Sequence, residues 1–142
     1  MKFLITIVTL VVTLLGLANH ASAQGFVSNC TWQGANLTGS FLGMYCNDND
    51  WAEFHYMWTW FDLGHCMLNN GGSLAAYDNG QFYGSCHDCS FRGSNTDFQF
   101  ACLCSDIDGN LKNSSYDINR IVWNHNGTLG CYGWQGNQSS RP

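Results

Sequence analysis

The sequence predicts an all-β fold built from two tandem, pseudo-symmetric repeats. Similar residues recur about 55 positions apart along the chain, which indicates an internal duplication. The chain is rich in asparagine and in turn-forming glycine, with 16 glycines, and it holds no helix-forming run. Residues 54–60 are rich in the aromatic side chains that favour strands. The eight cysteines indicate a framework closed by disulfides rather than a set of free thiols.

The first 23 residues are typical of a secretory signal peptide. Lys2 supplies the positive start, residues 3–17 are apolar, and Ala21-Ser22-Ala23 forms a small-residue cleavage site. The apolar stretch of about 15 residues is shorter than a comfortable membrane span. We therefore expect residues 24–142 to form a secreted, extracellular protein that does not insert into a membrane.

Residues 24–142 keep four basic residues against all ten acids, a formal net charge of −6. So acidic a chain excludes a mainly electrostatic interaction with nucleic acid or with anionic lipid. A chain of about 120 residues suits one compact unit, or two small halves that share a core. We therefore expect one domain at residues 24–142 and no nucleic-acid partner.

The first repeat covers about residues 25–79 and the second about residues 80–134. Residues 26–30 align with residues 82–86, and Cys46 aligns with Cys102, at an offset of 56. Residues 61–74 align with residues 116–129 at an offset of 55. Two copies are fewer than a stacked solenoid needs, so we expect the copies to complete each other's cores.

Each repeat contains one hairpin-turn signal and one aspartate that precedes a short turn. Residues 69–72 and 124–127 combine asparagine with glycine between apolar residues, which predicts a hairpin in each copy. Asp62 and Asp117 occupy matching positions before a short turn. We expect their carboxylates to accept backbone N–H groups as caps.

The predicted disulfides include Cys30–Cys46 and Cys86–Cys102, because 16 positions separate the two cysteines in each copy. Each bond would close one hairpin, and the chain-entropy model values a loop of that size at about 3 kcal/mol. Three pairings are then open for the remaining cysteines, which are Cys66, Cys89, Cys104 and Cys131.

A nested arrangement on the second hairpin also stays open. It joins Cys86 to Cys104 and Cys89 to Cys102, and it suits an antiparallel hairpin equally well. Four thiolates with this spacing are also able to hold zinc. An oxidising compartment favours disulfides, so we expect no metal and no other cofactor.

These features together resemble the cyanovirin-N homology family of carbohydrate-binding proteins. The resemblance lies in the Phe-x-x-Ser-Cys opening at residues 82–86 with its looser copy at 26–30, the cysteines at 46 and 102, the Asp-Leu/Ile turns, and the two Asn-x-x-Gly-Ser/Thr-Leu endings. It spans about residues 25–131, and the cysteine pattern is similar to secreted members from filamentous fungi. The resemblance implies two pseudo-symmetric halves, each a three-stranded sheet plus a β-hairpin, with the hairpins exchanged between the repeats.

The resemblance also implies a function, which is non-catalytic lectin binding of mannose-rich or related glycans at one shallow site per half. Short polar side chains that both donate and accept hydrogen bonds suit sugar hydroxyls. The first implied site collects Gly25, Ser28, Asn29, Asn47, Asn49, Asn124 and Asn126. The second implied site collects Asn69, Gly71, Gln81, Gly84, Ser85, Leu103 and Ser105.

We expect the second site to be weak or inactive. Leu68, Gly71, Gly84 and Leu103 stand where the family often has acidic, hydroxyl or basic groups, and Cys104 occupies a position that would face sugar. An alternative function follows from this loss, namely a secreted structural or effector protein of the same fold with lost or altered glycan binding.

Glycosylation sequons begin at five asparagines, which are Asn29, Asn36, Asn113, Asn126 and Asn137. A glycan on Asn29 or on Asn126 would sit on the first site.

An aromatic stripe is the most distinctive local feature. If residues 54–60 form a strand, then Phe54, Tyr56, Trp58 and Trp60 share one face. The second repeat is polar at the matching positions, which suggests that the stripe is partly exposed. Such a stripe would serve as a platform for sugar rings, as a homodimer interface, or as packing under a loop.

No group of catalytic residues is recognisable. Asp50 and Glu53 flank a turn that looks exposed, and no motif places a nucleophile beside His65 or His87. We therefore expect no catalytic residues and no enzyme activity.

Overall fold

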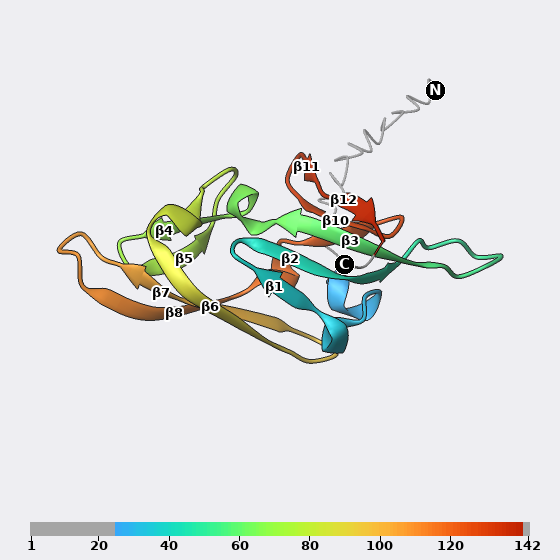
Figure 1. Ribbon diagram of the computed structural model, residues 1–142, viewed down its shortest axis with the longest axis horizontal. Coiled ribbons are helices and arrows are strands. Elements are labelled where there is room, and N and C mark those ends of the chain that lie inside the picture. The colour runs from blue at the N-terminus through green and yellow to red at the C-terminus, as the bar shows by residue number, and fades with distance from the viewer. Residues whose placement is uncertain (1–24, 141–142) are drawn as a thin grey trace, which may run out of the picture.

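The computed structural model describes residues 25–140, and the predicted signal peptide at residues 1–23 lies outside the described residues (Figure 1). Two antiparallel sheets and two hairpins make up the fold. The first sheet has the order β1-β2-β3-β12 and the second the order β6-β7-β8. Within residues 25–140, no helix has the length and apolar character needed to cross a membrane.

The strands of the first sheet are β1 (Asn36–Thr38), β2 (Phe41–Asn47), β3 (Tyr56–Asp62) and β12 (Asn137–Ser139). Those of the second sheet are β6 (Cys86–Gly93), β7 (Phe98–Ser105) and β8 (Leu111–Asp117). The hairpins are β4 (Met67–Asn70) with β5 (Ser73–Ala76), and β9 (Trp123–His125) with β10 (Thr128–Cys131), to which β11 (Trp134–Gln135) is added. Short 3-10 turns are η1 (Phe26–Ser28), η2 (Trp32–Gly34), η3 (Leu63–His65), η4 (Phe82–Gly84) and η5 (Ile118–Arg120).

The two hairpins are exchanged between the repeats, as the family resemblance implied. The β4–β5 hairpin of the first repeat packs on β7 and β8 of the second, and β10 of the second repeat lies against β3 of the first (Figure 1). Equivalent hydrogen bonds, from a hairpin N–H to a hydroxyl on the sheet, hold the two docked hairpins. The N–H of Leu74 donates to Ser114 Oγ at 2.8 Å, and the N–H of Leu129 donates to Thr59 Oγ1 at 3.2 Å.

One asparagine in each hairpin fixes the hairpin to the sheet on which it docks. Asn124 accepts the Gly127 N–H at 3.0 Å and donates its amide to the carbonyl of Asn47 at 2.8 Å. Asn69 makes the corresponding bonds in the first hairpin, to the N–H of the second turn glycine at 2.7 Å and to the carbonyl of the last residue of β7 at 2.8 Å. The side-chain amide thus joins turn and sheet, and we call these two residues the asparagine pins.

Both predicted turns are two-residue hairpin loops. Asn70 pairs with Ser73 across one turn, and His125 pairs with Thr128 across the other. The loop residues have positive φ throughout, at 60° and 97° in the first turn and 51° and 82° in the second. Two successive positive φ angles define the type I′ turn, whose twist matches that of paired strands. Glycine and asparagine tolerate this backbone, which explains why they occupy the loops.

The core is continuous across both halves, and its centre is aromatic. Phe26 from the first repeat packs against Phe98 from the second, with ring centroids 5.3 Å apart. Phe82 packs edge-on against Phe100 at 5.5 Å. All four rings are fully buried. Since residues of both repeats fill one core, neither repeat can bury its own apolar face without the other.

The two aspartate caps are confirmed. Asp62 Oδ1 accepts the Gly64 N–H at 2.8 Å at the start of η3, and Asp117 Oδ1 accepts the Asn119 N–H at 3.1 Å at the start of η5. Each carboxylate satisfies a backbone donor that the short 3-10 turn leaves without an internal partner. The repeated aspartate therefore ends the third strand of each sheet.

The prediction of Cys86–Cys102 is wrong, and the nested alternative is present. All eight cysteines are disulfide-bonded, so none of these thiols is available for zinc. Among the described residues, no group of three or more histidine, cysteine, aspartate or glutamate side chains is placed to hold a metal ion. The bonds join Cys30 to Cys46, as predicted, together with Cys66 to Cys131, Cys86 to Cys104 and Cys89 to Cys102.

An irregularity in β6 explains the pairing. The register between β6 and β7 shifts between His87 and Ser90, so that Asp88 and Cys89 together lie opposite the single residue Cys102. Asp88 adopts a φ of 50°, which is uncommon for a residue with a side chain. This is the geometry of a β-bulge, in which one strand carries an extra residue. The bulge brings Cys89 into reach of Cys102.

The structural counterpart of Cys46 is therefore Cys104 rather than Cys102. Cys30 faces Cys46 across an antiparallel bridge, and Cys86 faces Cys104 in the same way, with separations of 16 and 18 positions. Cys104 is fully buried, so its predicted position facing sugar is also wrong. An offset counted along the sequence cannot detect residues that were added within a hairpin.

Only the first half of the aromatic stripe is exposed. Phe54 and Tyr56 are exposed, whereas Trp58 retains 3% of its accessible surface. Gly43 on β2 provides the space for this packing, because a Cβ there would lie 2.6 Å from the Trp60 ring and 2.9 Å from the Trp58 ring. Trp58 and Trp60 therefore pack on the outer face of the first sheet, with ring centroids 5.4 Å apart.

We expect Asn69→Ala and Asn124→Ala each to lower the free energy of unfolding by about 1–3 kcal/mol. Each change leaves a backbone carbonyl and a turn N–H without their partner in a buried or part-buried position. Urea unfolding followed by tryptophan fluorescence measures the loss. Asn113→Ala, at an exposed position of β8, is the matched control and should change stability by less than about 0.5 kcal/mol. Equal stability of all three variants would refute the role of the pins.

Removing the Cys66–Cys131 disulfide by double substitution to alanine should cost about 4 kcal/mol, since it closes a loop of 65 positions. Removing Cys89–Cys102 in the same way should cost clearly less than about 3 kcal/mol, because Cys86–Cys104 still ties the same hairpin. Denaturant unfolding gives both values, and peptide mapping without reduction checks the pairing. Recovery of a Cys86–Cys102 peptide would contradict the bulged register.

Candidate functional site

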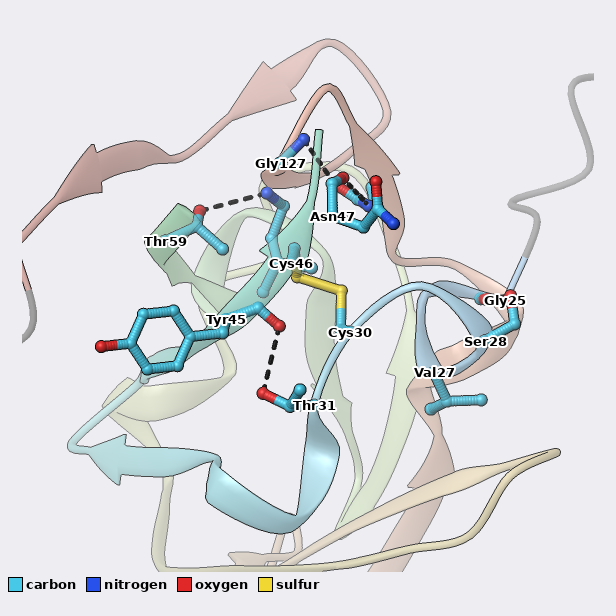
Figure 2. The surroundings of a disulfide bond; sticks show 12 residues. Gly25, Val27, Ser28, Cys30, Thr31, Tyr45, Cys46, Asn47, Thr59 and Gly127 are labelled. Carbon is cyan, nitrogen blue, oxygen red and sulfur yellow. Dashed lines mark hydrogen bonds between the residues drawn. A yellow bond between two sulfur atoms is a disulfide. The ribbon is translucent and has the colours of Figure 1, made fainter. Parts of the chain in front are cut away.

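Three asparagines gather at the end of β2 in the first half. Asn29, Asn47 and Asn49 line a hollow of about 370 Å³ together with Trp51 and Phe54. The Cys30–Cys46 disulfide ties the two chain segments that carry Asn29 and Asn47 (Figure 2). The backbones of these two residues are also joined by a 2.8 Å bond from the Asn47 N–H to the Asn29 carbonyl. A rigid frame therefore holds these amides beside one another.

Asn47 is the central residue of the hollow. Figure 2 shows it above the disulfide, next to Gly127 from the docked β9–β10 turn. Its backbone carbonyl accepts the amide of the pin Asn124, and its side-chain Oδ1 accepts the Asn49 N–H at 2.6 Å. An asparagine amide has two donor hydrogens and two acceptor lone pairs. The fold engages one of these four positions on the Asn47 side chain, so the side chain can still bond a ligand.

A capped loop forms the outer rim of the hollow. It runs from residue 48 to residue 55, between β2 and β3, and projects from the end of the sheet (Figure 1). Asp48 Oδ1 accepts the N–H groups of Asp50 at 3.0 Å and His55 at 3.3 Å, and its Oδ2 lies 3.1 Å from His55 Nδ1. These groups hold the pKa of Asp48 below its ordinary value, with the Asp50 N–H contributing most. Glu53, 3.4 Å from His55 Nε2, is the other acid facing this ring.

The corresponding loop of the second half is shorter but is capped in the same way. It covers residues 106–110, and Asp106 Oδ1 accepts the N–H groups of Asp108 and Asn110, both at 2.9 Å. The Asn110 N–H contributes most to holding the pKa of Asp106 below its ordinary value, and Lys112 adds an ion pair at 3.2 Å. The first-half loop is thus the same capped turn with three extra residues.

The remaining residues of the first predicted site lie beside the hollow rather than in its lining. Gly25 precedes η1, and its carbonyl accepts both the N–H and the hydroxyl of Ser28. Asn126 is exposed at the tip of the β9–β10 turn. Asn124 is nearly buried and acts through its bond to Asn47. Of the seven predicted residues, the structure brings Asn29, Asn47 and Asn49 together as lining.

The second predicted site is largely occupied by its own hydrogen bonds. Asn69 donates to Ser85 Oγ and to the Ser105 carbonyl, both at 2.8 Å, so these three residues are brought together. Both amide hydrogens of Asn69 are engaged in this way, and its oxygen caps the turn. In the first half, the pin Asn124 bonds the backbone carbonyl of Asn47 and leaves the Asn47 side chain largely free. The two halves are therefore chemically unequal.

The other residues of the second predicted site are dispersed around this cluster. Gly71 is exposed at the tip of the β4–β5 turn, and Gly84 is exposed at the end of η4. Gln81 has a φ of 51° and donates its side-chain amide to Asn79. Leu103 is half-buried on β7, where it pairs with β6 and β8. None of these four residues lines the hollow in the first half.

Sequence reasoning missed Trp51, which is 95% exposed and lies on the rim of the hollow. Phe54, 65% exposed, was expected on a strand but precedes β3. A signal was present in the sequence, since the first repeat carries three more residues between its second and third strands than the second repeat does. Extra residues with an aromatic side chain in a surface loop often have a functional role.

The structure is similar to several solved structures, two of which are described as CVNH proteins. A MoCVNH3 variant in complex with (N-GlcNAc)4 shares 15% identity with a TM-score of 0.65, covering 78% of this chain and 99% of that one. The microvirin:mannobiose complex shares 20% identity with a TM-score of 0.61, covering 76% and 98%. GzCVNH from Gibberella zeae shares 20% identity with a TM-score of 0.55, covering 68% and 88%.

A search of the curated proteins finds no significant match. The family model of the CVNH domain matches residues 26–130, which include both sheets apart from β12, the β4–β5 hairpin, and the β9–β10 hairpin apart from its last residue. The fold, the duplication and this match agree, and the chain belongs to the CVNH domain family.

Proposed function

We propose that the protein is a secreted, non-catalytic lectin that binds mannose-rich or related glycans in the hollow at the end of β2. The observation that carries the proposal is the placement of Asn29, Asn47 and Asn49 on one rigid frame beside exposed aromatic rings. Relatives of the same fold supply the class of ligand, since microvirin was solved with mannobiose and a MoCVNH3 variant with (N-GlcNAc)4.

The chemistry of the hollow suits a neutral, hydroxyl-rich ligand. Asparagine amides donate and accept at the same time, which matches the hydroxyl groups of a sugar. The disulfide and the pin Asn124 hold Asn47 before any ligand arrives. Binding then costs little side-chain and loop ordering, and more of the interaction energy appears as affinity.

The second half contributes little to binding in this proposal. Its pin Asn69 spends both amide hydrogens on Ser85 and Ser105. A sugar would have to break these bonds to reach the amide. The predicted homodimer through the aromatic stripe stays a prediction, and its exposed part is limited to Phe54 and Tyr56.

A secreted location agrees with four disulfides, which form and persist in oxidising compartments. The sequons agree with it as well. Asn36, Asn113, Asn126 and Asn137 are exposed, and Asn29 is half-buried on the hollow. We propose the sequons at Asn36, Asn113 and Asn137 as glycan attachment sites that leave the first site free.

One observation favours the second candidate, a secreted effector or structural protein without glycan binding. Asn29 heads a sequon and also lines the hollow, so a glycan attached there would cover the proposed site. Protein from a bacterial host with an oxidising compartment, which attaches no N-glycans, is to be compared with protein secreted by a eukaryotic host. Binding by the bacterial product alone would show that glycosylation blocks the site. A glycan array without any signal for the bacterial product would exclude the lectin.

Asn47→Ala should weaken binding of mannobiose by about tenfold or more, which corresponds to about 1.4 kcal/mol. The change removes the central amide of the hollow while leaving the backbone carbonyl that Asn124 bonds. Isothermal titration of the unglycosylated protein measures the affinity, with (N-GlcNAc)4 as a second probe. Asn113→Ala is the control and should bind as the wild type does, since it lies on an exposed strand of the other sheet. Unchanged affinity in Asn47→Ala would place the binding site elsewhere.

On going from neutral to acidic pH, binding should weaken mainly below about pH 4. Because the pKa of Asp48 is lowered by folding, its carboxylate stabilises the loop above the ordinary pKa, and this contribution is lost as the pH falls through the lowered value. Mannobiose titrations across this range measure the effect. Asp48→Asn should bind more weakly at neutral pH and lose the acid decline, whereas Asp106→Asn should keep it. An identical profile in Asp48→Asn would rule out this loop as the cause.

A further inference from the structure

The loop at residues 48–55 carries an aromatic pair that the fold does not need. Trp51 is 95% exposed and Phe54 is 65% exposed, and both belong to the lining of the hollow. The buried aromatic rings of the core lie elsewhere, on η1, η4, β3 and β7. Two large rings at the edge of a hollow that also contains three amides form the mixed apolar and polar surface that is typical of a ligand site.

Hydrogen bonds hold the backbone of the loop that carries these rings. Asp48 caps the loop at both ends, through the N–H groups of Asp50 and His55. Asp50 Oδ1 in turn accepts the Ala52 N–H at 2.9 Å, which fixes the backbone on both sides of Trp51. The indole therefore stands on a hydrogen-bonded turn next to the amides, and little ordering of the loop backbone would be needed when a ligand binds.

The second half shows what this loop is like without the aromatic pair. Its capped turn at residues 106–110 is three residues shorter and presents Ile107, which is 92% exposed, and no aromatic ring. It borders the cluster in which the pin Asn69 has no free amide hydrogen. The longer, aromatic loop thus occurs in the first half, where the side-chain amide of Asn47 remains available to a ligand. We take this joint occurrence as a sign that amide and rings serve one ligand.

Resting on the proposed function above, we propose that Trp51, assisted by Phe54, forms a stacking subsite for a second sugar ring next to the asparagine hollow. One face of a pyranose ring carries mainly C–H groups, which pack on the electron-rich face of an indole. Tryptophan offers a large rigid surface at low cost in conformational entropy. The site would then take two adjoining rings, one on the amides and one on the indole, and would prefer oligosaccharides to free mannose.

The test compares Trp51→Ala and Trp51→Phe with the wild type, all produced without N-glycans. We expect Trp51→Ala to bind mannobiose about tenfold more weakly and free mannose less than threefold more weakly. Trp51→Phe should recover part of the mannobiose affinity, because a smaller aromatic ring remains. Ile107→Ala removes the exposed apolar side chain of the other capped loop and should bind as the wild type does.

Tryptophan fluorescence gives a second readout that a structural role would not move. Stacking of a sugar on the exposed Trp51 should shift the emission of the wild type to shorter wavelength at saturating mannobiose, and this shift should be absent in Trp51→Phe. Equal mannobiose affinity in Trp51→Ala and wild type, with Asn47→Ala still impaired, would overturn the stacking subsite and leave the lectin standing. No binding of any tested sugar by the wild type would overturn both.

Discussion

The whole structure depends on the docking of each hairpin onto the sheet of the other repeat. Each sheet, of four strands in the first half and three in the second, has one apolar face, and the hairpin that covers this face comes from the opposite repeat. The asparagine pins Asn69 and Asn124 make the docking specific, because each amide joins the hairpin turn to a carbonyl at the end of the central strand. The Cys66–Cys131 disulfide then connects the residue before β4 to the last residue of β10 and closes the exchange covalently.

The candidate site is a by-product of this docking. Asn47 ends β2, and the carbonyl of this residue is the acceptor for the pin of the docked hairpin. Its side chain is left at the surface where the hairpin meets the sheet, a place that we call the junction. The Cys30–Cys46 disulfide and the capped loop flank this side chain. The equivalent junction in the second half has a serine at the matching position, and there the pin itself fills the space. One scaffold therefore yields one open junction and one closed junction.

Two local insertions break the symmetry of the duplication. A bulge in β6 adds the residue that lets Cys89 meet Cys102, which stiffens the second half. Three residues in the loop after β2 bring Trp51 to the edge of the open junction. An insertion at a hairpin tip leaves the ladder of hydrogen bonds between the strands intact, and a bulge disrupts this ladder only locally, so the fold tolerates both. The second half is thus reinforced, while the first carries the exposed features of a binding surface.

The sequence alone determined the duplication, the all-β class, the two hairpin turns and the aspartate caps, because each depends on residue type and short-range spacing. The resemblance to the family supplied the exchange of hairpins and the group of asparagines. Only the tertiary structure decided the partner of Cys86, the use of Asn124 as a pin and the place of Trp51 beside the hollow. These features depend on the register between strands, where one added residue changes which side chains meet, and spacing along the chain does not reveal that register.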